Sequence, residues 1–150
     1  MRSNIRIIIA DDHELFAEGL KLLLSQSGNL DVVGIANDGR NFLEMVKARP
    51  ADIVLLDISM PKLNGLDVIR YLKMHNSTLK IIVLSTYAEL HVIAKAQELG
   101  ADGYILKNSN PNYLMAAVQN VILGGSSFPD VPKPLGNVQI TIDPFLQSFQ

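Results

Sequence analysis

The chain of 150 residues contains no cysteine and no tryptophan, and aromatic residues make up only 6% of it. Without cysteine, it cannot form disulfide bonds, thiolate zinc sites, iron–sulfur clusters or a thiolate nucleophile. This composition is compatible with a reducing compartment, and we expect a cytoplasmic protein. Long hydrophobic runs are also missing: the longest, such as 7–10 and 81–84, fall far short of the roughly 20 residues that cross a bilayer.

Neither sign of charge dominates, since 13 basic and 15 acidic residues give a net charge of −2. No basic run is present, whereas a protein that coats nucleic acid normally shows a basic face. The first apolar run ends directly in Asp11 and Asp12 without a cleavage signal, so we do not expect a signal peptide. With 48% apolar residues and a mean hydropathy of +0.21, the chain can build a single globular core.

Short apolar segments alternate with amphipathic stretches along the chain. Three of the segments consist almost solidly of Ile, Val and Leu, which is typical of strands covered on both faces of a parallel sheet. The alternation therefore predicts an α/β fold with a five-stranded, parallel, doubly wound sheet. The five predicted strands are 5–10, 30–36, 53–56, 79–84 and 104–106.

Residues that begin and end helices agree with this alternation. Asp38 is expected to cap the second helix, and Asn110–Pro111 is a typical helix start. Gly100 and Gly124–Gly125 mark the ends of the fourth and fifth helices. We expect one folded domain over residues 1–125.

The composition changes after Gly125. Four of the seven prolines fall in the last 26 residues, and only three residues there are charged. Residues 126–150 therefore read as a proline-rich linker or tail. Within it, 138–142 alternates like a short strand, which would be marginal alone.

Polar residues follow four of the five predicted strands. Asp11 and Asp12 follow the first, Asp57 the third, Ser85 the fourth and Lys107 the fifth. Ligands of open α/β sheets bind at the carboxyl ends of the strands, so these side chains are expected to meet at one edge.

Three clustered carboxylates repel one another unless a cation joins them, and Mg²⁺ suits such oxygen ligands. One carboxylate could then accept a phosphoryl group as an acyl phosphate, with Lys107 and Ser85 contacting the phosphoryl oxygens. Taken singly, each residue also has a structural explanation. Asp11 or Asp12 could cap the first helix, Asp57 could belong to a turn, and Lys107 could be a solvated strand end.

The same residues carry a family resemblance. Over roughly residues 4–125, the chain resembles a response-regulator receiver domain of bacterial two-component signalling. The most specific feature is Asp57 followed by Pro61 four residues later and by Gly65 eight residues later. The resemblance implies the flavodoxin-like strand order 2-1-3-4-5. The matching segments are 8–13, 53–61, 64–65, 83–85 and 100–107.

The resemblance implies a role for each residue at the predicted site. Asp57 would be the phosphoacceptor. Asp12, Asp57 and the backbone carbonyl of Ser59 would coordinate Mg²⁺, with Asp11 nearby or bound through water. Lys107 would pair with the acyl phosphate.

Two further residues would form the switch of such a domain. Ser85 would supply the switch hydroxyl, and Tyr104 would turn inward when Ser85 is drawn to the phosphoryl group. Tyr104 has a structural reading as well, as a strand aromatic packed on a helix.

Asp11-Asp12-His13-Glu14 and the segment 100–104 are similar to the NarL/LuxR-type subfamily. This resemblance implies a sensor histidine kinase or small phosphodonor as partner, a homodimer, and transcriptional output through a C-terminal DNA-binding helix-turn-helix. Residues 126–150 are too few and too rich in proline for that domain, so we expect no DNA-binding domain in this chain.

Other functions remain open at this stage. His13, His75 and His91 are scattered and are interpreted as surface residues rather than metal ligands. A small phosphohydrolase with Asp57 as nucleophile would lack its usual second aspartate, since that position is Ser59. A flavodoxin-like electron carrier, a scaffold that is not phosphorylated and a stand-alone receiver acting through protein contacts are further alternatives. The first expectation is a signalling phosphoacceptor that assists its own phosphorylation and dephosphorylation, not an enzyme.

Overall fold

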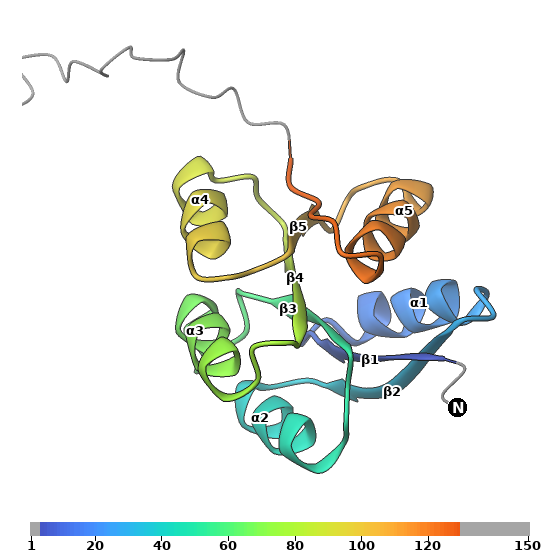
Figure 1. Cartoon of the computed structure of the whole chain (residues 1–150), viewed down its shortest axis with the longest axis horizontal. Coiled ribbons are helices and arrows are strands. Elements are labelled where there is room, and N and C mark those ends of the chain that lie inside the picture. The colour runs from blue at the N-terminus through green and yellow to red at the C-terminus, as the bar shows by residue number, and fades with distance from the viewer. Residues whose placement is uncertain (1–3, 130–150) are drawn as a thin grey trace, which may run out of the picture.

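The computed structural model describes residues 4–129, which form one sheet flanked by helices (Figure 1). Strands and helices alternate strictly along the chain. The strands are β1 (Ile5–Ala10), β2 (Leu30–Ala36), β3 (Ile53–Asp57), β4 (Lys80–Ser85) and β5 (Gly103–Leu106). The helices are α1 (Glu14–Ser25), α2 (Gly39–Ala48), α3 (Gly65–His75), α4 (Leu90–Glu98) and α5 (Pro111–Ile122).

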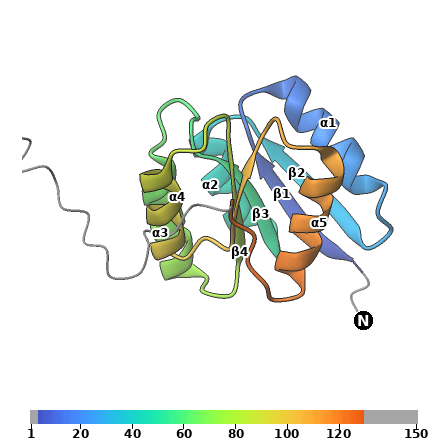
Figure 2. The same ribbon diagram turned by 90° about the horizontal axis from the view of Figure 1, so that it is seen from above.

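All neighbouring strands pair in parallel, in the order β2-β1-β3-β4-β5. The predicted fold class and strand order are therefore confirmed, with strand ends shifted by one residue at most. Figure 2 shows α1 and α5 on one face of the sheet and α2, α3 and α4 on the other. A parallel sheet covered on both faces requires apolar side chains on both, which explains the nearly solid apolar strands.

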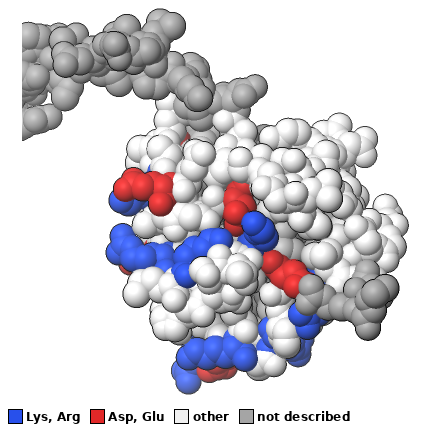
Figure 3. Space-filling view, in the orientation of Figure 1, with Lys and Arg blue, Asp and Glu red and all other residues white. Residues whose placement is uncertain are grey.

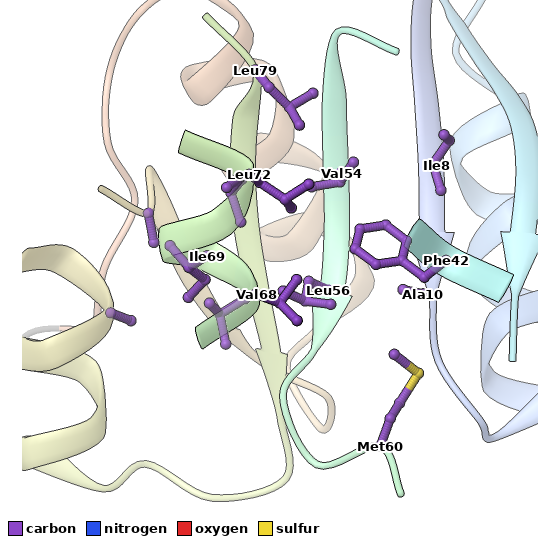
Figure 4. Close-up of a cluster of buried hydrophobic side chains, with 14 of the residues drawn as sticks. Ile8, Ala10, Phe42, Val54, Leu56, Met60, Val68, Ile69, Leu72 and Leu79 are labelled. Atoms are coloured by element: carbon purple, nitrogen blue, oxygen red, sulfur yellow. The ribbon is translucent and has the colours of Figure 1, made fainter. Parts of the chain in front are cut away.

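The core consists of two clusters, one on each face of the sheet. Alternate residues of β1 point to opposite faces, so Ile8 belongs to one cluster and Ile7 to the other. In the first cluster, Phe42 of α2 and Ile69 of α3 pack against the sheet (Figure 4). The second cluster joins the sheet to α1 and α5. These two layers hold the carboxyl ends of the strands in place.

The helix boundaries follow the predicted signals. The Asp38 side chain caps α2 by accepting a hydrogen bond from the N–H of Asn41. The Asn110 side chain caps α5 by accepting one from the N–H of Asn112, and Pro111 is the first residue of that helix. Gly100 and Gly124 adopt positive φ angles of 109° and 93°, which suits glycine at a helix end.

Residues 126–129 lie against the sheet, where Ser127 forms a parallel bridge with Gly103 of β5. The strand predicted at 138–142 lies outside the described residues. Over residues 4–129, none of the helices has the length and apolar character needed to cross a membrane.

Candidate functional site

The carboxyl edge of the sheet gathers the polar residues that follow the strands. Asp57 ends β3 and Ser85 ends β4, while Asp11 and Lys107 come directly after β1 and β5. The strands are parallel and adjacent, so these ends share one edge. Asp11, Asp57 and Ser85 are almost completely buried, at 0%, 1% and 4% exposure.

The ammonium group of Lys107 connects the two buried acids. Its Nζ lies 2.8 Å from Asp11 Oδ2 and 2.9 Å from Asp57 Oδ2. Burial alone would lower the pKa of Lys107, but the hydrogen bonds to Asp11 and Asp57 outweigh it, so this pKa lies above its usual value. Lys107 therefore stays protonated and can neutralise further negative charge at Asp57.

The loop after β3 holds Asp57 in place. Its Oδ1 accepts a hydrogen bond of 2.8 Å from the N–H of Ser59. The loop then passes close to Gly65 at the start of α3, where a Cβ atom would lie only 2.6 Å from the Cα of Ile58. Between them, Lys62 adopts a positive φ of 63°. The spacing from Asp57 to Gly65 thus has a steric reason, because only glycine fits this approach.

Asp11 and Asp12 complete the acidic part of the site. Asp11 Oδ1 accepts a hydrogen bond of 2.8 Å from the N–H of His13. Burial raises the pKa of Asp11 above its usual value, although Lys107 and the His13 N–H partly oppose this. Neither aspartate caps α1, since its N-cap is His13, which makes no capping bond with its side chain.

His13 is an exposed residue, as predicted, but its ring also lies beside the acidic cluster. Its Nδ1 lies 3.3 Å from Asp11 Oδ1, 3.8 Å from Asp12 Oδ1 and 2.9 Å from Lys107 Nζ. One ligand atom each from Asp11, Asp12, His13 and Asp57 can be chosen so that all lie within 4.8 Å of one another. Its position directly after the two aspartates was the available signal in the sequence.

A second group of contacts links Ser85 to Tyr104. The Ser85 hydroxyl donates to the backbone carbonyl of Tyr87 at 3.0 Å, and the Tyr104 hydroxyl donates to the same oxygen at 2.8 Å. Tyr104 is 1% exposed and belongs to the core cluster that α2, α3 and α4 cover. Two hydroxyl groups therefore meet at one carbonyl of the loop after β4.

Comparison with known proteins assigns the class of this fold and site. The chain matches the family described as response regulator receiver domain over residues 7–119. It belongs to this family, and its relatives place it with response regulators of the NarL/LuxR type. Receiver domains are signalling proteins and generally bind Mg²⁺ in an acidic pocket.

Three similar proteins illustrate the relationship. The transcriptional regulatory protein DegU of Brevibacillus brevis is 37% identical over 124 residues, which are 83% of this chain and 52% of that protein. The receiver domain of the response regulator NarL from Mycobacterium tuberculosis superposes with a TM-score of 0.76 at 34% identity, covering 81% of this chain and 98% of that one. The isolated receiver domain of RcsB from Salmonella enterica serovar Typhimurium gives 0.79 at 29% identity, with 85% and 94% covered. The chain thus spans about half the length of the curated relative.

Proposed function

We propose that Asp57 accepts a phosphoryl group from a sensor histidine kinase or a small phosphodonor. The observation that carries this proposal is the convergence of Lys107 on Asp57 and Asp11, residues from three different strand ends. A buried carboxylate beside a fixed ammonium group and a backbone N–H is suited to phosphoryl transfer, which requires positioning and charge compensation above all.

In the transfer step, a carboxylate oxygen of Asp57 attacks the phosphorus atom of a phosphorylated histidine. The P–O bond to Asp57 forms as the P–N bond to the imidazole breaks, and the leaving nitrogen takes a proton from solvent. Lys107 and the Ser59 N–H, at 2.9 Å and 2.8 Å from the two Asp57 oxygens, offset the charge around the reacting group. Hydrolysis resets the site: a water oxygen attacks the phosphorus atom, the P–O bond to Asp57 breaks, and inorganic phosphate leaves Asp57 as a free carboxylate.

The residues present also fit Mg²⁺. Its proposed ligands are Asp12, Asp57 and the backbone carbonyl of Ser59, with Asp11 nearby or bound through water. The carboxylates of Asp11, Asp12 and Asp57 can each place an oxygen within 4.8 Å of the others, and a hard divalent cation would offset their combined charge. When bound, Mg²⁺ supplies positive charge for the phosphoryl oxygens.

Ser85 and Tyr104 form the proposed switch. To donate to a phosphoryl oxygen, the Ser85 hydroxyl must leave the Tyr87 carbonyl, which Tyr104 can then hold alone. This couples the modification of Asp57 to the position of Tyr104 and to the loop before α4. We propose that this change alters dimer or partner contacts of a cytoplasmic receiver.

The proposed receiver unit comprises residues 1–125, with 126–150 as a linker or tail. Relatives such as DegU are named transcriptional regulators. We accordingly propose transcriptional output through a C-terminal helix-turn-helix that follows the receiver.

The test is labelling of the protein by a radiolabelled small phosphodonor in the presence of Mg²⁺. Asp57→Asn should abolish labelling, because an amide oxygen is a poor nucleophile, while the exposed Asp31→Asn serves as control and should label normally. Label that persists in Asp57→Asn would contradict the assignment of the phosphoacceptor.

A further inference from the structure

The segment after α5 is attached to the outer edge of β5. The N–H of Ser127 donates to the carbonyl of Asp102 at 3.0 Å, and the N–H of Tyr104 donates to the carbonyl of Ser127 at 2.8 Å. These two bonds make a parallel bridge between Ser127 and Gly103. One of them belongs to the backbone of the proposed switch tyrosine itself.

Side chains and two glycines fix this attachment. Asn120 of α5 donates through Nδ2 to the carbonyl of Ser126 at 2.8 Å and to the hydroxyl of Ser127 at 3.0 Å. A Cβ atom on Gly103 would lie 3.0 Å from the Ser127 carbonyl, and one on Gly125 would lie 2.5 Å from Asn120 Oδ1. A side chain at either position would therefore press on this attachment, through the Ser127 carbonyl at Gly103 and through the Asn120 side chain at Gly125.

The next two residues contact the surroundings of Tyr104. Phe128 packs against the core cluster that contains Tyr104. Pro129 lines a groove together with Tyr104, Leu106 and Tyr113, so a Tyr104 ring leaving the core would enter space that Pro129 borders. Proline has no N–H to donate to the β5 edge, so the pairing with this edge cannot be continued there.

We infer that residues 125–129 form a clamp that positions Tyr104 in its buried state and couples the proposed switch to the segment that follows α5. This inference rests on the proposed function of Ser85 and Tyr104. The clamp holds the Tyr104 backbone through Ser127 and restricts its ring through Phe128 and Pro129. The proposed switch pairs modification of Asp57 with the inward position of Tyr104, so by linkage a contact that stabilises the buried tyrosine also favours that modification.

The experiment uses the full chain with two separate substitutions in the clamp. Phe128→Ala removes the packing, and Asn120→Asp keeps the size of the side chain but removes the donating amide. Leu123→Ala is the matched control, because Leu123 is 85% exposed at the end of α5. NMR of ¹³C-labelled tyrosine reports the position of the Tyr104 ring. Hydrogen exchange measures how strongly the backbone N–H of Tyr104 is protected. Titration with beryllium fluoride, a phosphoryl mimic, in the presence of Mg²⁺ reports the coupling to Asp57.

Both clamp variants should lower the population of buried Tyr104 and speed exchange of its amide. They should also weaken beryllium fluoride binding by about fivefold or more, in the usual range of coupling between sites. Leu123→Ala should change none of these. Urea unfolding confirms that the variants are folded. If Phe128→Ala does not fold, the result for the surface substitution Asn120→Asp decides whether the inference holds.

Tyr104 signals that stay unchanged in the folded variants would overturn the inference, as would unaltered beryllium fluoride affinity. Failure of the unsubstituted chain to bind beryllium fluoride would instead count against the proposed phosphoacceptor site. The two ideas therefore fail in distinguishable ways.

Discussion

Lys107 lies where two carboxylates that are almost wholly removed from water need a counter-charge. Its Nζ is within 3.0 Å of both Asp11 and Asp57, and 5.1 Å from the centre of the Phe16 ring, which can also favour a cation. Removing one member of such a group leaves the other charges unpaired. The same single residue thus serves both the stability of the site and its proposed chemistry.

Tyr104 gives a prediction of pH dependence at the scale of one residue. Burial raises the pKa of its hydroxyl, Ser85 opposes this in part, and the charge of Glu89 adds a smaller increase. The folded-state pKa thus lies above the unfolded value of about 10. The stabilisation that the protonated Tyr104 hydroxyl contributes is therefore fully present below pH 10 and is lost as the pH rises through the folded-state pKa. Stability should therefore fall above pH 10.

The measurement compares urea unfolding of the unsubstituted chain and Tyr104→Phe from pH 8 to 11. At pH 8 the variant should be less stable by about 1 kcal/mol, since it lacks the hydrogen bond to Tyr87. That difference should shrink above pH 10, because phenylalanine does not ionise. Tyr113→Phe, at a surface position, should not change the pH profile, and a constant difference for Tyr104→Phe would contradict the expectation.

At the scale of elements, the loop between β3 and α3 determines how Asp57 is presented. Gly65 starts α3 with no room for a side chain against Ile58, and the Asn64 side chain caps the helix by accepting from the N–H groups of Leu66 and Asp67. The helix and the strand end are therefore positioned relative to each other by contact rather than by loop length.

A pair of glycine substitutions tests this. Gly65→Ala should destabilise the protein by about 1–3 kcal/mol, since backbone atoms must move, and should slow labelling of Asp57. Gly19→Ala lies within α1, where a Cβ would meet nothing within 4 Å, and should stabilise by about 0.5–1 kcal/mol. Urea unfolding measures both, and equal effects of the two changes would show that the contact with Ile58 does not matter.

At the scale of the whole molecule, charge is unevenly distributed. Residues 108–129, which include α5 and the whole clamp, contain no charged residue. In Figure 3, the surface over α5 is correspondingly free of charged side chains, whereas these gather on the side of α2, α3 and α4. The contact of the clamp with β5 thus involves no ion pair with this segment, and salt should affect it little.

Because the site joins three strand ends, Mg²⁺ should stabilise the entire fold. At ten times its dissociation constant, the ion should add about 1.4 kcal/mol to the free energy of unfolding and raise Tm by roughly 4 °C. Asp12→Asn should reduce this gain, and Asp31→Asn should leave it intact. Calorimetry with and without MgCl₂ measures the shift, and the same gain in Asp12→Asn would exclude Asp12 as a ligand.

Much of the fold was predictable because its signals are local. The caps at Asp38 and Asn110 depend on a few neighbouring residues, and the apolar strands are recognisable from their composition alone. The meeting of acidic and basic side chains was also predictable, because a parallel sheet places every carboxyl end at the same edge. The contact of His13 with the acidic cluster was not predicted, because its spacing from the acidic residues along the chain resembles no metal motif.

The sequence by itself determined the succession of strands and helices, the residue types at the strand ends and the glycine that the Asp57 loop needs. Only the tertiary structure decided that Lys107 would join Asp11 and Asp57, 96 and 50 residues away along the chain. It likewise decided that His13 would turn into the acidic cluster and that Ser127 would bond to the strand carrying Tyr104. Strand composition and capping follow from short-range sterics and hydrogen bonding, whereas these contacts exist only after distant strands have been packed side by side.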